Sequence, residues 1–565
     1  SKDLSFSAHG HAFAETDYKG KSSLIGQFKV NDILASPTAL FEKAKKIDLA
    51  TLNFRLFLDP FEIQIERVHI FDKTHKLDAR GAARLAIENS GWAISMEAEI
   101  EGLNHGSLLY YWPKTFRPNE RDWLENNLAS ANLSNIFFNF NQKPEVRKNS
   151  SLIFSFNNAV FKVLDDFPVI EKARGLFSVL NHRLTISFDD AQLDVSNFEK
   201  VDISGSEFII LDTGKQPSPA YLKVVGAGSL KSVLDLPGYF STSEFGRLVE
   251  NVDMFDGLVQ FQATFDFPLE KGLKPVDIVY HAKGVVHDFS ISQIPKIAKV
   301  TAKNISFDLT PEDLSFHGVV EALDTNFEVE YIYDFGSETA FLNAEFAVDK
   351  NLIDNFKIPL SSEILSGKSK ASARLVFPKD NEASIDIFSD LKGLELSIPQ
   401  LNWEKSPGTS GSFVATGIFK DSPKLDVISL YANGLRMKAL PLVTTDEGLV
   451  GFEIKNFKID KSIDVTGVIN PNKKLIIKSG YFDARPFFLP KVQKKSDAFR
   501  KTIAKVQLDG VRLTKSALLT NFIGDLKFGQ NLSGKFTADI GEGAKLSGEF
   551  EPEFSETAVR IKSNH

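Results

Sequence analysis

Residues 258–269 read LVQFQATFDFPL, and this stretch shows the pattern that decides the fold. Every second residue is apolar: Val259, Phe261, Ala263, Phe265 and Phe267. The residues between them are polar: Gln260, Gln262, Thr264 and Asp266. Successive side chains of a strand point to opposite faces, so the stretch predicts a β-strand with one apolar and one polar face.

The same alternation recurs along most of the chain. Further apolar positions of this kind are Phe6, Phe154, Phe156, Phe188, Phe307, Phe316, Phe327 and Val329. Turn-forming sequences such as TPED (310–313) separate the strands at intervals of roughly 8–14 residues. A sandwich or a barrel would fit the two-faced strands, but no Pro/Gly/Ser-rich linker divides the chain into modules. We therefore predict a mainly-β fold, one long, twisted and curved sheet of antiparallel type that forms an elongated open groove.

Helical segments are expected to be few and short. The candidates are residues 36–47, residues 241–252, residues 515–526 and the residues after Pro118. The last of these belongs to YYWPKTFRPNERDWLENNL (110–128), in which Trp112-Pro113 is expected to end a strand. Trp123, Leu124 and Leu128 recur at helical spacing, which predicts an amphipathic helix packed on the sheet or, alternatively, a plug inside the groove.

Composition excludes several classes of function. The chain of 565 residues has no cysteine, so disulfides, thiolate metal sites and thiol catalysis are ruled out. A net charge of −8 without a basic stripe argues against nucleic acid as a partner. His9 and His11 would share a strand face, but no third metal ligand lies at suitable spacing. No catalytic motif is recognisable, so we expect neither an enzyme nor a cofactor.

The 49 Phe residues, against 10 Tyr and 4 Trp, indicate a large apolar surface that needs no hydrogen-bond partners. Such a surface could be a covered core, or it could face a partner, because large exposed apolar patches bind something. A groove lined by Phe suits acyl chains, whose burial contributes about 0.8 kcal/mol per methylene. The alternating Phe and Val residues named above are therefore the candidate lining. The small number of Trp and Tyr residues argues against saccharide binding.

Several short stretches resemble the YhdP-like branch of the AsmA-like proteins. The most specific is Trp112-Pro113, then Arg121, then Trp123-Leu124 and Leu128, which is similar to that family's WP…R.W…L signature. Residues 161–193, 226–240, 265–291 and FDARPFF (482–488) resemble further family elements, and the signature region covers about 75–340. The chain departs from the family at residues 129–132, where ASAN replaces the usual glycine-containing turn.

This resemblance implies bridge-like lipid transfer by a repeating β-groove, with phospholipid carried across the periplasm between the inner and the outer membrane. It implies that residues 1–565 are one continuous periplasmic piece of an inner-membrane-anchored protein, lacking the N-terminal anchor and the AsmA-like C-terminal region. The expected partners are phospholipids, both membranes through the missing ends, and envelope proteins. The alternative is an envelope scaffold, or an assembly factor for outer-membrane proteins that offers its edge strands to a partner.

Overall fold

A computed structural model provides the coordinates of the chain. The residues described are 4–563 without 37–40, 42, 89–90, 146–148, 163–167, 196–197, 237–251, 271–276, 295–296, 357, 359, 420–422, 445–447, 471–473, 488–501, 529–530, 542 and 554–555. Contacts group the chain into two compact units. Unit 1 is Ser1–Ile291 with Ser306–Pro311, and unit 2 is Ser292–Ile305 with Glu312–His565.

Strands account for 73% and helices for 8% of the structure, which confirms the predicted mainly-β class. The strands up to residue 309 are β1 (Leu4–Thr16), β2 (Ser22–Ala35), β3 (Lys45–Leu58), β4 (Phe61–Asp72), β5 (Leu77–Glu88), β6 (Gly91–Asn104), β7 (Leu128–Gln142), β8 (Asn149–Phe161), β9 (Val169–Leu180), β10 (Arg183–Asp194), β11 (Val201–Asp202), β12 (Glu207–Ile210), β13 (Ser218–Ser229), β14 (Phe255–Leu269), β15 (Val279–Ile294) and β16 (Ile297–Leu309). Those that follow are β17 (Asp313–Ala322), β18 (Thr325–Asp334), β19 (Thr339–Val348), β20 (Leu365–Gly367), β21 (Ser369–Pro378), β22 (Ala383–Ser389), β23 (Leu394–Ile398), β24 (Trp403–Lys405), β25 (Gly411–Phe419), β26 (Pro423–Ala432), β27 (Leu435–Thr444), β28 (Gly448–Ile459), β29 (Ile463–Asn470), β30 (Lys474–Asp483), β31 (Thr502–Arg512), β32 (Leu518–Phe528), β33 (Leu532–Ile540), β34 (Ala544–Glu553) and β35 (Glu556–Ser563). The helices are α1 (His105–Tyr111), α2 (Pro118–Asn127), α3 (Leu230–Asp235) and α5 (Lys350–Asn355), with short 3₁₀ turns at η2 (Val252–Met254), η4 (Pro399–Leu401) and η5 (Arg485–Phe487).

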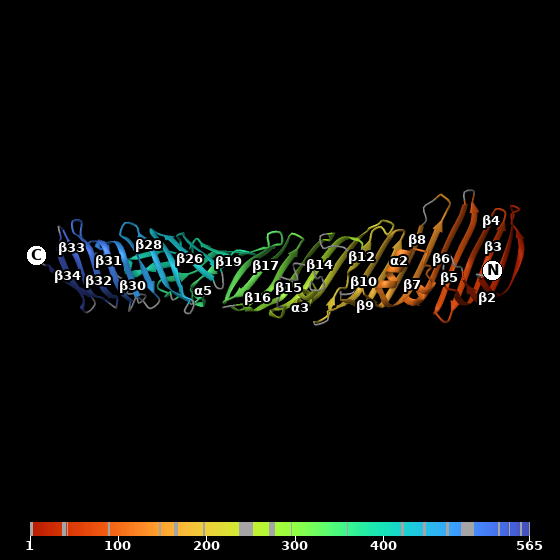
Figure 1. Ribbon diagram of the computed structural model, residues 1–565, viewed down its shortest axis with the longest axis horizontal. Coiled ribbons are helices and arrows are strands. Elements are labelled where there is room, and N and C mark those ends of the chain that lie inside the picture. The colour runs from red at the N-terminus through yellow and green to blue at the C-terminus, as the bar shows by residue number, and fades with distance from the viewer. Residues whose placement is uncertain are drawn as a thin grey trace. The chain divides into compact units, whose positions relative to one another are not determined.

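Thirty-two of these strands belong to one sheet, and β20, β23 and β24 form a second, small sheet. In unit 1 each strand from β1 to β10 pairs antiparallel with the next one in sequence (Figure 1). Strand β10 then pairs with both β11 and β12, and these two short strands pair with β13. In the described pairings β1 is bonded to β2 and β35 to β34, with no bond between the two ends. The long open sheet predicted from the sequence is thus confirmed.

The sheet is of antiparallel type, as predicted, but at one described place in unit 2 the neighbouring strands β30 and β31 run parallel. Parallel neighbours need a connection of a dozen or more residues that returns the chain to the same end of the sheet. Eighteen residues, 484–501, separate the two strands in sequence, and the described part of this segment contains η5, within the FDARPFF stretch. Asp483 accepts hydrogen bonds from the backbone N–H (3.1 Å) and from Nε (2.9 Å) of Arg485 at this point.

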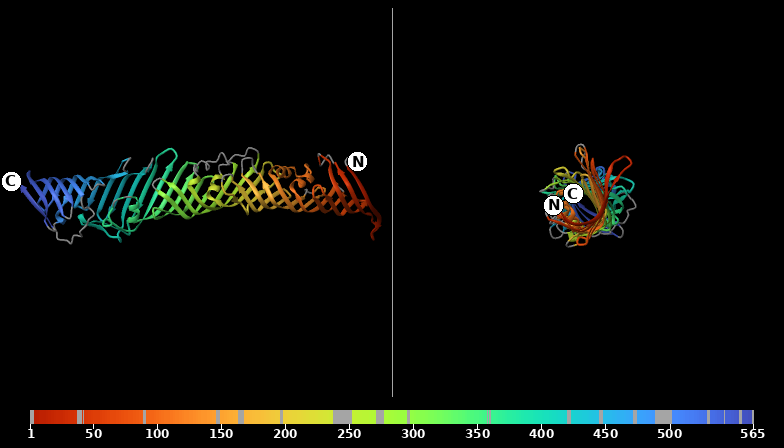
Figure 2. Two further views of the ribbon diagram at one scale, coloured as in Figure 1. Left: turned by 90° about the horizontal axis from the view of Figure 1, so that it is seen from below. Right: turned by 90° about the vertical axis from the view of Figure 1, so that its right-hand side faces the viewer.

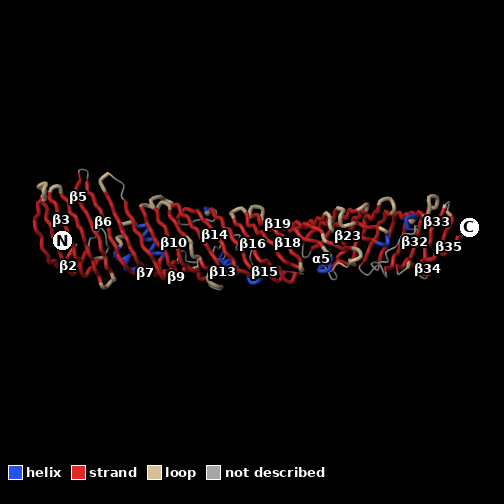
Figure 3. Tube along the Cα trace, turned by 180° about the vertical axis from the view of Figure 1, so that it is seen from behind, coloured by secondary structure: helices blue, strands red, loops and turns tan. Residues whose placement is uncertain are grey.

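The sheet of unit 1 is curved, and its first strands, β1 to β4, bend around one side in the end-on view (Figure 2, right). Alternation of apolar and polar residues sets the two faces. In β8, for example, Leu152, Phe154 and Phe156 are buried, whereas the residues between them are half-buried. Helices α1 and α2 lie against the strands near β7 (Figure 3).

The helix predictions had mixed outcomes. The helix after Pro118 is confirmed as α2, and the chain enters β7 directly at Leu128, without the turn that the family places there. The strand expected before Trp112 is instead helix α1, which begins with an Asn104 cap that accepts a hydrogen bond from the backbone N–H of Ser107 (2.8 Å). No described helix has the length and apolar character that a membrane crossing requires.

The helix predicted for residues 515–526 is wrong, because Leu518–Phe528 is strand β32. Its pairing with β33 shifts register between Thr520 and Ile523, and Asn521 has a left-handed φ of 52°. This bulge places the buried Leu519 and Phe522 three residues apart and so imitates helical spacing. The end of the helix predicted for 36–47 is also wrong, since Lys45 begins β3. Residues 37–40, 42 and 241–251 lie outside the described part of the chain.

Each unit has its own buried core. In unit 1 the core joins the apolar face of β7–β10 to Leu108, Trp112 and Leu124 of the α1–α2 segment. In unit 2 the small sheet β20–β23–β24 contributes Leu365, Leu394 and Trp403 to a core that includes residues of β27, β29 and β31–β33. Elements inserted between strands therefore cover part of the apolar sheet face in each unit.

Candidate functional site

One row of side chains in unit 1 shows how the apolar face changes along the sheet. Each residue of the row is the Cα partner of the next on the neighbouring strand, so all lie on the same face. From β8 to β15 the row is Phe154, Phe177, Ile186, Phe208, Leu222, Phe265 and Tyr280. The face that carries the predicted Phe265 is therefore continuous with the face that forms the core.

Exposure divides this row into two parts. Phe154, Phe177 and Ile186 are each 1% exposed. Phe208, Leu222, Phe265 and Tyr280 are half-buried. The change occurs beside α2, where the Trp123 ring stacks on the Phe208 ring, with centroids 5.9 Å apart and planes at 18°. Beyond this contact, the apolar side chains of β13–β15 keep surface that is open to a partner.

Helices α1 and α2 form a cover that is held by the signature residues themselves. The Trp112 indole Nε1–H donates to the carbonyl of Phe116 (2.7 Å), which closes the turn between the helices. The Arg121 guanidinium is buried and donates to the carbonyls of Trp112 (3.2 Å) and Leu109 (3.5 Å) at the end of α1. A cation is favourable at a helix C-terminus, so Arg121 binds α2 to α1. The WP…R.W residues thus build the cover.

A second set of contacts fastens the cover to the strands. Arg117, with a left-handed φ of 46°, donates from Nη1 to Glu120 Oε1 (2.9 Å), from Nη2 to Ser150 Oγ (2.7 Å) and from Nη2 to the Asn181 carbonyl. Glu120 Oε1 also accepts from the Thr213 hydroxyl (2.9 Å). Arg117 and Glu120 are largely buried, and a buried ion pair needs these additional hydrogen bonds to offset its desolvation. The start of α2 is therefore fixed to the ends of β8 and β9.

A half-buried apolar part of unit 1, called the β13–β15 face below, is defined by Leu222, Phe261, Phe265, Phe267 and Tyr280. The rings of Phe265 and Tyr280 lie with centroids 6.4 Å apart across β14 and β15. The opposite side of β14 carries the polar residues found in the sequence, of which Gln260 and Gln262 are exposed. This part of the sheet therefore presents an apolar face and a wet face.

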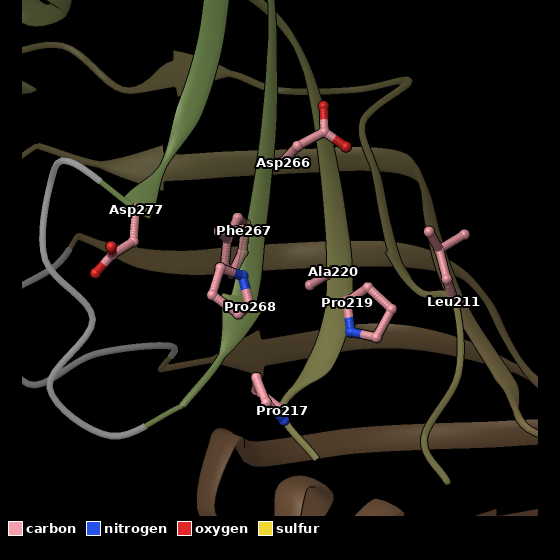
Figure 4. A pocket seen from close by; sticks show the side chains of 8 residues that line it. All are labelled: Leu211, Pro217, Pro219, Ala220, Asp266, Phe267, Pro268 and Asp277. Carbon is pink, nitrogen blue, oxygen red and sulfur yellow. The ribbon is translucent and has the colours of Figure 1, made fainter. Parts of the chain in front are cut away.

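A shallow pocket of about 330 Å³ lies at the ends of β13 and β14 (Figure 4). It is lined by Leu211, Pro217, Pro219, Ala220, Asp266, Phe267, Pro268 and Asp277. Most of these side chains are apolar, and Ala220 and Phe267 are Cα partners on the apolar face. Pro219 and Pro268, the next pair of Cα partners, and Asp266 alternate with these two residues along the strands, so they belong to the opposite side and the pocket is not an extension of the β13–β15 face.

Unit 2 has a comparable half-buried stretch on β17–β21, called the β17–β21 face below. Phe316 pairs with Tyr331 (6.0 Å between centroids), and Phe327 pairs with Phe346 (5.0 Å). Burial in these apolar surroundings, together with the nearby Tyr333, raises the pKa of Tyr331 above its ordinary value.

The predicted lining residues fall into three environments. Phe154, Phe156 and Phe188 are buried in the core beneath the cover, together with Trp112, Leu124 and Leu128. Phe261, Phe265, Phe267, Phe307, Phe316, Phe327 and Val329 are half-buried. Val259 is 2% exposed beside α3, and Phe6 is 52% exposed on β1. The structure thus brings Phe261, Phe265 and Phe267 together on one half-buried face, and Phe261 also packs against the covered core.

The predicted lining contains only two members of the row, Phe154 and Phe265, and lacks Phe177, Ile186, Phe208, Leu222 and Tyr280. Two of these residues lie on strands with a weak pattern. Phe208 is on β12, which is only four residues long, and Leu222 is on β13, which contains the half-polar stretch PAYLKVV. The alternation of apolar and polar residues within β13 would have identified Leu222. Phe208 is identified only by its strand pairing with Ile186 and Leu222. The predicted histidine pair lies on β1, and no group of three metal-ligating side chains occurs among the described residues.

Comparison with known proteins gave one match. The profile of a family described as "YhdP protein" matches residues 24–466, well over half of the chain. The comparisons with curated proteins and with solved structures returned no match.

Proposed function

Since this chain belongs to the YhdP protein family, a family of envelope proteins, we propose that it carries phospholipid between the inner and the outer membrane, across the periplasm. Acyl chains would lie on the open apolar faces, and head groups would stay in water. The inner-membrane anchor, both membranes and further envelope proteins belong to this proposal as partners of the complete protein.

The observation that carries the proposal is the half-buried aromatic surface of the β13–β15 face. Phe261, Phe265 and Phe267 lie on one face of β14, with Ala263 between the first two and no polar residue among them. Apolar surface contributes about 25 cal/mol per Å² when it is removed from water, so a saturated chain gains from contact here and loses no hydrogen bond. A phenyl-rich lining also binds every methylene about equally, which suits movement along it.

The cover defines where lipid can lie in this conformation. Phe154, Phe177 and Ile186 have almost no accessible surface, so an acyl chain cannot contact them while α1 and α2 are in place. Lipid in unit 1 is therefore expected on β13–β15, on the open side of Trp123. Passage over β8–β10 would require the cover to move.

Site-specific photo-crosslinking tests the proposal. A benzophenone amino acid placed at Phe265 should crosslink to phospholipid in the purified chain, as detected by mass spectrometry. The matched control places it at Gln262, which is exposed on the opposite face of the same strand. Crosslinks at both positions to the same extent, or at neither, would overturn the proposal. Crosslinks to an outer-membrane protein instead would favour the assembly-factor alternative.

A further inference from the structure

Glycines on the apolar face recur opposite phenylalanines, and the rings lie over them. Gly226 on β13 is the Cα partner of Phe261 on β14, which in turn is the partner of Gly284 on β15. A Cβ built at Gly226 would lie 2.2 Å from Cζ and 2.3 Å from Cε1 of Phe261. One built at Gly284 would lie 2.8 Å from Cε1 of Phe307. Both rings therefore occupy the space that a side chain at the glycine would take.

The same arrangement is found elsewhere. A Cβ at Gly26 on β2 would lie 2.4 Å from Cε1 of its partner Phe54, and a Cβ at Gly548 on β34 would lie 2.2 Å from Cζ of its partner Phe536. An aromatic ring that lies across a glycine of the neighbouring strand is a known means of filling a sheet surface. Here the arrangement also reduces the height of the side chain above the sheet, because the ring lies along the sheet and does not project from it.

The position of the ring matters most on the β13–β15 face, where apolar side chains keep accessible surface. Phe261 and Phe307 are half-buried, and both pack against the cluster of Leu230, Val259 and Val286. A Phe that stands roughly perpendicular to the sheet, as strand side chains usually do, would project into the space above the β13–β15 face. The two glycines remove that projection.

We propose that Gly226 and Gly284 set the clearance of the acyl-chain path over β13–β15, by letting Phe261 and Phe307 lie on the sheet. The inference rests on the proposed function and names the residues that determine how bulky a chain the face admits. Gly226 is the position at which it can be tested. Its substitution conflicts with the far end of a movable ring, whereas a Cβ at Gly284 would also lie 2.3 Å from the backbone oxygen of Gln260.

The test is Gly226→Ala in the full chain, with the amount of co-purified phospholipid per chain as the readout. The added methyl group should lift the Phe261 ring off the sheet and reduce bound phospholipid several-fold. The double variant Gly226→Ala/Phe261→Ala should regain lipid, because the lifted ring is gone. Gly408→Ala is the matched control, since Gly408 has an ordinary φ and no atom within 4 Å of a Cβ.

The outcomes separate the two proposals. Absence of phospholipid from the unsubstituted chain would contradict the proposed function itself. Phospholipid at the same level in the unsubstituted chain and in Gly226→Ala would overturn the clearance role alone. So would a loss in Gly226→Ala that removal of the Phe261 ring does not reverse. Thermal unfolding of each variant checks that the fold is retained, and a change in lipid without a change in unfolding temperature supports the inference.

Discussion

The Trp123 ring of α2 stacks on the Phe208 ring of β12, and this contact is the boundary between the covered and the open apolar face of unit 1. On one side of it, Ile186 is 1% exposed. On the other side, Leu222 and Phe265, which follow Phe208 in the same row, are half-buried. The covered part of this row thus ends at an aromatic side chain of the family signature.

Trp123→Ala should therefore extend the open face by one strand. Loss of the stacked pair removes about 1 kcal/mol of aromatic interaction in addition to the buried area. A benzophenone amino acid at Phe208 should then crosslink more phospholipid in the Trp123→Ala variant than in the unsubstituted chain. Trp92→Ala is the control, because Trp92 is 49% exposed and outside the cover. Equal crosslinking in all three proteins would show that Trp123 does not limit access.

Arg121 should be essential for the stability of the cover. Its side chain is 6% exposed and hydrogen-bonds two carbonyls at the end of α1. Arg121→Met keeps most of the volume but leaves these acceptors without a charged donor, at a cost of about 2–3 kcal/mol. Faster amide hydrogen exchange in residues 105–127 would report the loss.

Arg174→Met provides the comparison, since Arg174 is 53% exposed and pairs with Asp190 at the surface. Exposed pairs contribute about 0–1 kcal/mol, so exchange in α1 and α2 should not change in this variant. If Arg121→Met exchanged no faster than Arg174→Met, the assigned role of Arg121 would be wrong.

The other end of the cover should respond to acid through Asp72. Burial opposes ionisation of this carboxyl, but hydrogen bonds from the Tyr111 hydroxyl, from His75 Nδ1 (2.6 Å) and from the Thr74 backbone N–H (2.9 Å) outweigh it, so its pKa lies below the ordinary value. An unfolded Asp has a pKa of about 3.9. Between the two values only the unfolded chain takes up the proton, so stability is full above about pH 4 and falls as the pH drops through the folded pKa.

Thermal unfolding of unit 1, followed from pH 7 down to pH 3, should show this loss. In Asp72→Asn the group cannot titrate, so the variant should be less stable at pH 7 and have a shallower dependence on pH below 4. Identical acid profiles for the two proteins would exclude Asp72 as the responsive group.

In unit 2 the small sheet is fastened by Trp403. Its Nε1–H donates to the carbonyl of Asn433 (2.9 Å), and Asn433 Nδ2 donates to the carbonyl of Glu404 (2.5 Å). Trp403→Phe removes the hydrogen bond to the Asn433 carbonyl and part of the buried side chain. The free energy of unfolding should therefore fall by about 1–2 kcal/mol. Denaturant titration measures the change, and Tyr431→Phe, at a residue 50% exposed, should leave the midpoint unaltered.

Much of the fold follows from local pattern. Strict alternation in 258–269 and 326–335 predicts β14 and β18 and identifies their apolar faces, because a strand has one repeat that does not depend on its neighbours. Where a bulge interrupts the repeat, as at Asn521, the same reasoning gives a helix in place of β32. The parallel pairing of β30 and β31 depends on a connection whose path is invisible to periodicity.

The candidate site was less predictable, because tertiary contacts, and not the local sequence pattern, decide whether the apolar face of a strand is covered. Phe154 and Phe265 have the same alternation, and they share one row of Cα partners, but the first is beneath α1–α2 and the second is open. The sequence indicates that the 110–128 stretch packs on the sheet; which strands it covers depends on contacts between distant residues, such as Arg117 with Ser150 and Asn181. Phe208 belongs to a strand too short to show a repeat.

The decisive substitution for the proposed function is a pair of charges on the open face. Phe261→Asp/Phe265→Asp places two carboxylates at half-buried positions on the apolar side of β14, where a charge beside an acyl chain is unfavourable because it loses hydration. Phospholipid bound to the purified chain should fall strongly, and crosslinking to lipid from neighbouring positions should fall with it. The control, Gln260→Asp/Gln262→Asp, adds the same charges to the same strand on its exposed face and should bind as much lipid as the unsubstituted chain. If the two double variants retain equal amounts of phospholipid, the apolar side of β14 is not the surface on which lipid is carried.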